Sequence, residues 1–359
     1  MISQHFVLNR ADKIGDVVLT LPMAGILKET FPGCKVSLLG QRYTAPLAHA
    51  CEHIDAVYAW DEIAELPNQA DRIKRFRGFG ADVIIHIYPQ PAIAKLARQA
   101  RIALRIGTSR RLFHWSTCNR LVYVRRKNRP LHEAQLNIEL LRGVGIKRFY
   151  DLNEISTYFG LSNISTLPPN LAACLAPGKF NLIVHPKSAG TSREWPIQYF
   201  ARLIESLPPE RFNVLITGSE QEGHLVRDKL PVELPNVRDL MGRASLTELI
   251  ALIHTADALL AASTGPLHIA AALGKPTFGV YVPFRSKHTG RWGPIGPRTR
   301  TFQRSQRCTH CPNPSDCQCM RLIVPDEIKA CLLEVAAGHR KESRPDNLHT
   351  PSPMIIVHR

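Results

Sequence analysis

The stretch HFVLNRADKIGDVVLTLP, residues 5–22, joins an apolar run to a helix-period segment through a short polar loop. We predict a strand over 5–8 and a helix over 17–30. In the rest of the first half, strands are predicted over 35–39, 55–60 and 82–87, and a helix over 91–101. This alternation indicates right-handed βαβ units built on a parallel sheet.

The second half repeats the rhythm. Strands are predicted over 181–184, 213–217, 258–262 and 277–281, and helices over 197–206, 220–230, 246–254 and 266–273. Residues 162–180 contain three prolines and Gly178, a composition typical of a linker. We therefore expect an α/β chain with two doubly wound, Rossmann-like domains facing each other across a cleft. The expected bounds are 1–161 for the first domain, 162–180 for the linker, 181–338 for the second domain and 339–359 for a flexible tail.

Charge is distributed unevenly along the 359 residues. Lys and Arg number 46 against 30 Asp and Glu, a net charge of +16, and residues 1–150 hold 23 of the basic and 12 of the acidic side chains. An anionic partner is therefore expected at the first domain. No apolar run is long enough to span a membrane, and the N-terminus does not resemble a signal peptide. We expect a cytoplasmic protein, at most peripheral at the inner face of the cytoplasmic membrane.

Three loops carry residues suited to chemistry, and the first is ADKIGDVVLTLP, residues 11–22. It follows a predicted strand, so it should lie where ligands bind in doubly wound sheets. Asp16 stands at the predicted start of a helix. It could act as an N-cap that accepts a backbone N–H, as a functional carboxylate, or as both.

The second and third segments are HPKSAGTSREWPIQYF, residues 185–200, and AASTGPLHIAAALGKPT, residues 261–277. The second combines small residues with cations, which favours phosphate binding over an ordinary strand–helix link. In the third, a strand ends at Ala262 and a helix follows Gly265, and His268 is placed to donate a hydrogen bond to a phosphate. Ser263 or Thr264 could instead serve only as an N-cap.

The chain resembles glycosyltransferase family 9, the lipopolysaccharide heptosyltransferases. Three motifs of that family have similar strings here in the same order: DKIGDVVLTLP, SAGTSREWP and STGPLHIAAALGKPT. RIGTSRR and LHEAQLNIELLRGVGI extend the similarity, which runs from the N-terminus to about residue 335. The resemblance implies a GT-B fold and inverting, metal-independent transfer of a heptose from a nucleotide diphosphate, with ADP-heptose as the expected donor and no cofactor.

The resemblance also implies roles for individual residues. Asp16 takes the place of the general base in the acceptor-binding first domain. Donor-binding positions in the second domain are Lys187, Ser188, Thr191, Arg193, Gly218, Ser263, Thr264, Gly265 and His268. Acceptor-binding positions are Arg10, Lys13, Arg110 and Arg111. Some family members carry Asp where this chain has Ser263, which leaves the donor open.

The chemistry agrees with this resemblance. Displacement at an anomeric carbon needs a base beside the acceptor hydroxyl and positive groups around the departing diphosphate. No Asp-x-Asp pair for a metal occurs in the chain. A sugar-nucleotide epimerase of the same architecture, or a non-catalytic module for anionic lipid or nucleic acid, stays as an alternative.

Two further features concern partners. Residues 95–129 contain eleven basic and no acidic side chains, which predicts contact with a phosphorylated lipopolysaccharide core at an anionic membrane surface, or else a solvated basic face. No nucleic-acid motif accompanies them, so nucleic acid ranks last. The spacing of Cys308, Cys311, Cys317 and Cys319 permits a structural zinc site but is tighter than usual at its end. The oligomeric state is left open.

Overall fold

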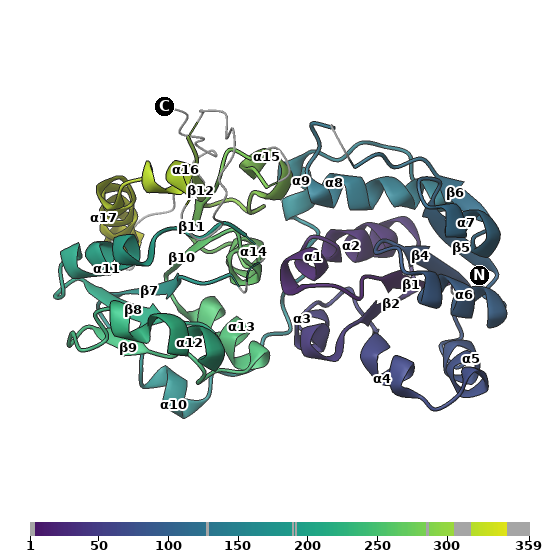
Figure 1. Ribbon diagram of the computed structural model, residues 1–359, viewed down its shortest axis with the longest axis horizontal. Helices are drawn as coiled ribbons and strands as arrows, with labels where there is room; N and C mark the ends of the chain where they lie inside the picture. Colours follow the sequence, from purple (N-terminus) through teal and green to yellow (C-terminus); the bar gives the residue numbers. More distant parts are fainter. Residues whose placement is uncertain are drawn as a thin grey trace. The chain divides into compact units, whose positions relative to one another are not determined.

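The computed structural model describes residues 4–126, 129–188, 190, 192–284, 287–304 and 317–342. The chain divides into two compact units, 1–164 and 165–359 (Figure 1). The predicted sites at Thr191, Cys308 and Cys311, and the tail beyond residue 342, lie outside the described residues. Residues 339–342, predicted to belong to the flexible tail, are instead the end of a long helix.

The first unit contains a six-stranded parallel sheet with the order β3-β2-β1-β4-β5-β6. Its strands are β1 (His5–Asn9), β2 (Lys35–Gly40), β3 (Ala56–Ala59), β4 (Val83–His86), β5 (Leu104–Thr108) and β6 (Arg120–Val122). Its α-helices are α1 (Ile14–Val18), α2 (Leu21–Thr30), α3 (Ala45–His49), α4 (Trp60–Glu65), α5 (Gln69–Arg77), α6 (Pro91–Gln99), α7 (Leu112–Thr117), α8 (Glu133–Ile138) and α9 (Leu152–Ser156). Two 3₁₀ segments, η1 (Arg42–Thr44) and η2 (Glu139–Val144), complete it.

The second unit has the corresponding parallel order β12-β11-β10-β7-β8-β9. Its strands are β7 (Phe180–His185), β8 (Phe212–Ile216), β9 (Val237–Asp239), β10 (Ala258–Ala262), β11 (Thr277–Val280) and β12 (Thr299–Phe302). Its helices are α10 (Pro169–Ala172), α11 (Ile197–Ser206), α12 (Glu220–Val226), η3 (Arg227–Lys229), α13 (Leu246–Thr255), α14 (Gly265–Ala272), α15 (Thr289–Trp292), α16 (Gln318–Arg321) and α17 (Pro325–Glu342).

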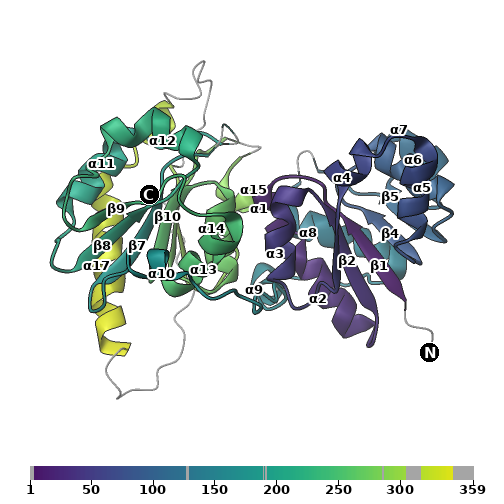
Figure 2. The same ribbon diagram turned by 90° about the horizontal axis from the view of Figure 1, so that it is seen from below.

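Both faces of the first sheet are buried. Val7 of β1 belongs to an apolar cluster with Phe76 of α5 and Ile93 of α6. Its neighbours Phe6 and Leu8, which point to the opposite face, are fully buried as well. Figure 2 shows helices on either side of the sheet in each unit. The arrangement confirms the prediction of two doubly wound α/β sheets.

The predicted helix over 17–30 is wrong in two respects, because helix α1 already begins at Ile14 and the structure divides the segment into α1 and α2. Pro22 stands in the first turn of α2. Proline has no backbone N–H, and its ring would clash with the carbonyl four residues earlier, so one helix cannot run through this point. The predicted helix over 220–230 likewise ends early, at Val226, and tightens into η3.

In the first sheet, β2 and β3 lie on one side of β1 and β4 lies on the other side. In the second sheet, β8 and β9 lie on one side of β7 and β10 lies on the other side. The strand order therefore reverses between β1 and β4 and between β7 and β10. Ligands of such sheets bind beyond the carboxyl ends of the strands at this reversal. The loops after β1 and after β7 and β10 therefore occupy the two positions where the fold favours a site. Among the described helices, none combines the length and the apolar character of a membrane span.

Candidate active site

The loop after β1 and the first turn of α1 place Arg10 and Asp16 together at the carboxyl edge of the first sheet. Arg10 directly follows the strand and is only 4% exposed, and the backbone N–H of Arg10 donates to the carbonyl of Leu39 at 2.9 Å. Its Nη2 donates to Asp16 Oδ1 and also lies 3.6 Å from Asp12 Oδ2. The Asp16 side chain remains 18% exposed. The ion pair therefore orients a carboxylate that solvent can still reach.

Asp16 is not the N-cap of α1, so that alternative from the sequence is wrong. The N-cap residue is Lys13, whose side chain makes no capping hydrogen bond, and Asp16 lies in the first turn. A carboxylate there is stabilised by the positive end of the helix dipole. Lys13 itself is exposed and belongs to the same loop. The side chain of Asp16 is thus available for chemistry rather than committed to the backbone.

Neighbouring charges surround this pair. Burial raises the pKa of Asp12, and the negative charge of Asp16 raises it further. Arg10 Nη1 lies 3.9 Å from Glu133 Oε1 at the start of α8. Glu133 is 2% exposed and also pairs with Arg126. Buried carboxylates of this kind require cationic partners, so Arg10 and Arg126 share Glu133.

Helix α8 fixes the backbone of the same loop through Asn137. Arg126 Nη2 donates to Asn137 Oδ1 at 3.1 Å, and Asn137 Nδ2 donates to the carbonyl of Leu19 at 3.1 Å. Thr20 Oγ1 donates to the carbonyl of Asp16 at 2.9 Å. Neither Glu133 nor Asn137 was predicted from the sequence as a site residue. Their presence in LHEAQLNIELL, within the family-like segment, was the only signal.

Arg110 and Arg111 follow β5, and both are exposed. They lie at the same edge of the sheet as Asp16. Strand β5 is the second strand from β1, so the two backbones are about 10 Å apart at ordinary strand spacing. The structure therefore does not bring them into contact with the Arg10–Asp16 pair. They line the same edge, where an extended anionic molecule could meet them.

In the second unit, the loop after β7 contains an internal ion pair. Lys187 Nζ lies 2.5 Å from Glu194 Oε2, and Glu194 Oε1 accepts hydrogen bonds from the backbone N–H and the hydroxyl of Ser188. Trp195 is buried, and its Nε1 donates to the carbonyl of Ile323 at 2.8 Å. From the sequence, Lys187 and Arg193 were both predicted to contribute positive charge to a phosphate-binding loop. Lys187 is therefore already paired with Glu194, whereas it was predicted to bind phosphate.

Two buried polar atoms, one in the loop after β10 and one in α14, lack hydrogen-bond partners among the described residues. Thr264 occupies the N-cap position of α14, yet its side chain makes no capping hydrogen bond, so the prediction of a hydroxyl cap is wrong for Thr264. Thr264 Oγ1 and His268 Nδ1 find no hydrogen-bond partner in the described part of the chain. Burial lowers the pKa of His268 to about 4, so its imidazole is neutral near pH 7. Such unpaired buried atoms are costly unless a ligand or water meets them.

The remaining donor-binding predictions lie at the same edge of the second sheet. Ser263 follows β10 and shares a hydrogen bond with the hydroxyl of Tyr281, which is buried. Gly265 begins α14, where free backbone N–H groups and the helix dipole favour an anion. Gly218 follows β8, the neighbour of β7, and its carbonyl accepts from the N–H of Gly242 at 2.9 Å.

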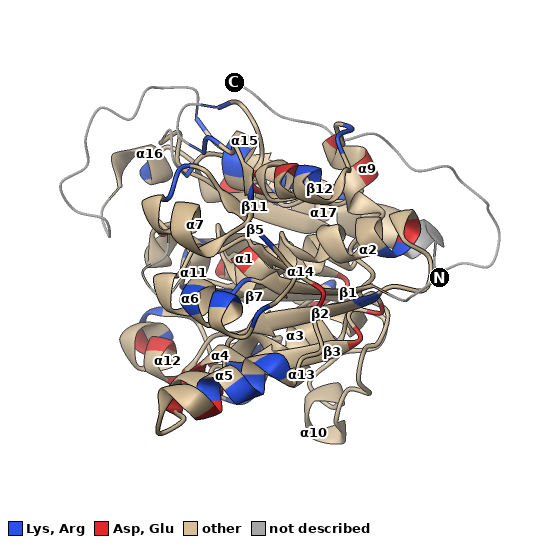
Figure 3. Cartoon of the chain, turned by 90° about the vertical axis from the view of Figure 1, so that its right-hand side faces the viewer, with Lys and Arg blue, Asp and Glu red and all other residues tan. Residues whose placement is uncertain are grey.

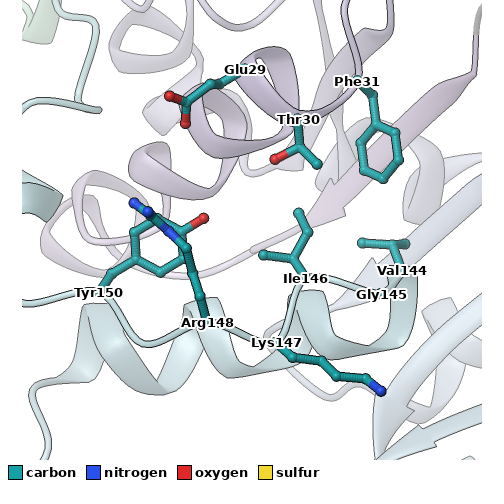
Figure 4. Close-up of a pocket in the computed structure, with 9 residues that line it drawn as sticks. All are labelled: Glu29, Thr30, Phe31, Val144, Gly145, Ile146, Lys147, Arg148 and Tyr150. Atoms are coloured by element: carbon teal, nitrogen blue, oxygen red, sulfur yellow. The ribbon is translucent and has the colours of Figure 1, made fainter.

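A cavity of about 540 Å³ lies elsewhere in the first unit (Figure 4). Glu29 and Arg148 stand on opposite walls of it, and Tyr150 closes one end. Phe31, which also lines the cavity, precedes β2, so the cavity lies at the amino edge of the sheet. Asp16 lies at the carboxyl edge, and the cavity is separate from the candidate site.

The cysteine cluster is only partly described. Cys317 is buried and Cys319 is half-buried, and no group of three possible metal ligands occurs among the residues with described positions. Because Cys308 and Cys311 lie outside them, the zinc hypothesis stays a prediction.

Comparisons with known proteins agree with this geometry. Residues 72–319 match the model of glycosyltransferase family 9 (heptosyltransferase). Lipopolysaccharide heptosyltransferase 3 of Escherichia coli K12 is 23% identical over 279 residues, which cover 74% of this chain and 79% of that protein. A Haemophilus influenzae protein named only as a presumed glycosyltransferase is 28% identical over 306 residues, 81% of this chain and 86% of that one.

Solved structures show the same fold. The structure of E. coli ADP-heptose lipopolysaccharide heptosyltransferase II superimposes with a TM-score of 0.74 at 18% identity, covering 94% of this chain and 99% of that one. E. coli heptosyltransferase WaaC with ADP gives a TM-score of 0.66 at 17% identity, covering 92% and 100%. These likenesses confirm the GT-B fold, and the family match confirms the resemblance noted in the sequence. The chain is a heptosyltransferase-like glycosyltransferase and belongs to glycosyltransferase family 9.

Proposed function

We propose that this enzyme transfers a heptose from ADP-heptose to the inner core of lipopolysaccharide at the cytoplasmic face of the membrane, with inversion at the anomeric carbon and without a metal. The observation that carries the proposal is the accessible carboxylate of Asp16, held by Arg10 at the strand-order reversal of a family 9 enzyme. The proposal assigns base and acceptor to the first unit and the donor to the second.

Asp16 would accept the proton of the acceptor hydroxyl. The oxygen would attack the anomeric carbon from the face opposite the diphosphate, and ADP would leave, so the configuration inverts. Arg10 would keep Asp16 in position, and Arg10 itself is held by Glu133. A base so placed typically contributes roughly 10²- to 10⁴-fold to the rate.

The donor would bind at the reversal between β7 and β10. The N–H groups at the start of α14 and the side chain of Arg193 would meet the diphosphate. Thr264 Oγ1 and His268 Nδ1, which lack partners among the described residues, would each gain one in the complex. The Lys187–Glu194 pair would then shape the loop rather than bind phosphate.

The substrates are inferred from the relatives. One relative is named a lipopolysaccharide heptosyltransferase, and a structure of similar fold holds ADP. The basic residues at the carboxyl edge of the first sheet, including Arg110 and Arg111, suit a phosphorylated acceptor.

The test combines transfer and binding. Purified enzyme is incubated with ADP-heptose and lipopolysaccharide whose core lacks heptose, and the anomeric configuration of the product is read by NMR. Thermal unfolding in the presence of ADP, UDP or GDP identifies the nucleobase of the donor, because at equal concentration the nucleotide with the lowest Kd raises the unfolding temperature most. Retention of configuration, hydrolysis or epimerisation of the donor without acceptor, or equal stabilisation by all three nucleotides would contradict the proposal.

A further inference from the structure

Three apolar side chains are strongly exposed near one another in the first unit. Leu112 is 89%, Trp115 65% and Tyr123 59% exposed. Leu112 and Trp115 stand three residues apart on α7, a spacing that places them on one face of the helix. Tyr123 directly follows β6.

The backbone of Ser109 links the side chain of Trp115 to the backbone next to Tyr123. Its N–H donates to the carbonyl of Val122 at 3.0 Å, and its carbonyl accepts from Trp115 Nε1 at 3.0 Å. Trp115 and Tyr123 therefore flank the same residue, although the chain between them includes a helix and a strand. The hydrogen bond also holds the Trp115 ring in place while most of its area faces solvent.

The charged residues in this part of the sequence are all basic. Arg120 and Arg125 are exposed on either side of Tyr123 in the sequence, and residues 83–132 contain no Asp or Glu. Helix α6, which packs beside α7, likewise shows basic but no acidic positions (Figure 3). We call Leu112, Trp115, Arg120, Tyr123 and Arg125 the α7 surface.

We propose that the α7 surface docks the enzyme on a bilayer that contains anionic phospholipid, with the apolar side chains entering the interface and the arginines meeting lipid phosphates. Aromatic and aliphatic side chains among basic residues are typical of interfacial attachment. Leu112 favours lipid over nucleic acid, because an aliphatic side chain offers nucleic acid neither charge nor a stacking surface. The inference deepens the proposed function and rests on it only for the acceptor.

Docking at this place would suit a lipid-linked acceptor. The loops after β5 and β6 lie at the carboxyl edge of the sheet, and so does the loop that carries Asp16. The edge that meets the bilayer would then be the edge that receives the acceptor.

The test measures cosedimentation of the full chain with vesicles of equimolar phosphatidylglycerol and phosphatidylcholine, and with vesicles of phosphatidylcholine alone. Leu112→Ser/Trp115→Ser/Tyr123→Ser should lower partitioning onto the anionic vesicles at least tenfold. Arg120→Gln/Arg125→Gln should lower it by roughly 30-fold, since each basic residue near an anionic surface contributes about fivefold. Matched controls are Phe149→Ser, 66% exposed, and Lys74→Gln/Arg77→Gln on α5, and both should bind as the wild type does.

A second readout is independent of affinity. Brominated acyl chains should quench the fluorescence of Trp115, and the quenching should be lost in Trp115→Phe. Equal binding of wild type and the apolar triple variant, or binding that single-stranded RNA abolishes without any Trp115 quenching, would overturn the inference.

Activity on a soluble acceptor without acyl chains separates the two proposals. The apolar triple variant should keep wild-type turnover on it while losing vesicle binding. Absence of any transfer by the wild type, with vesicle binding intact, would remove the proposed function and leave the docking surface standing.

Discussion

Replacing Asp16 by Asn removes one negative oxygen and leaves the shape of the side chain almost unchanged. If Asp16 is the base, the turnover number should fall roughly 10²- to 10⁴-fold, because an amide cannot accept the proton of the acceptor hydroxyl. The affinity for the donor should change by less than about threefold, since the donor is assigned to the other unit. A change of this size is typical of a substitution that lies away from the feature measured. Transfer of heptose and binding of ADP are measured separately.

The structure also bounds the effect of this change on folding. Losing the only partner of a buried charge costs about 3–5 kcal/mol. Arg10 would keep Asp12 at 3.6 Å and Glu133 at 3.9 Å, so a smaller loss of about 1–2 kcal/mol in the free energy of unfolding is expected. Urea denaturation measures it. The variant should therefore remain folded at assay temperature.

Asp12→Asn is the matched control. Asp12 lies on the same loop, is 22% exposed and approaches the same guanidinium nitrogen. Its substitution should lower turnover less than tenfold. The assignment of Asp16 as base is refuted if Asp16→Asn, shown to be folded, turns over within tenfold of the wild type, or if both substitutions have equal effects.

Three further predictions concern the metal, the acid stability and the packing. EDTA should leave transfer unchanged, because Arg193 and the start of α14 are proposed to meet the diphosphate charge; activity that Mg²⁺ restores after chelation would contradict this. Burial lowers the pKa of His86 to about 3, against about 6.5 in the unfolded chain. Between these two pKa values the unfolded state therefore binds more protons than the folded state. The contribution of His86 to the free energy of unfolding is fully present above pH 6.5, and it should fall by up to about 1.4 kcal/mol per pH unit on acidification. Denaturation at pH 4–7 should show a shallower dependence in His86→Leu, and an identical one would remove His86 as a cause. Gly107→Ala should lower the free energy of unfolding by about 1–3 kcal/mol, since the added Cβ would lie 2.5 Å from His114 Nδ1; an unchanged urea midpoint would show that the ring can move.

Local patterns in the sequence were sufficient for the buried strands and for the loops that follow them. Apolar runs such as those of β7 and β10 predict strands because a parallel sheet is buried on both faces. Four strands were missed, β5, β6, β9 and β12, and each of them contains an arginine that interrupts its apolar character. The helix break before Pro22 could have been predicted from the proline alone.

The sequence by itself determined the alternation of strands and helices, the family, and the position of Asp16 at the start of the helix that follows the first strand. Only the tertiary structure decided which side chains meet. Arg10 pairs with Glu133, and the carbonyl of Leu19 accepts a hydrogen bond from Asn137, in both cases across more than a hundred residues of sequence. Glu194 forms an ion pair with Lys187, which was predicted to bind phosphate. Periodicity reports which face of an element is buried, whereas the pairing of charges depends on distances that the packed sheets and helices set.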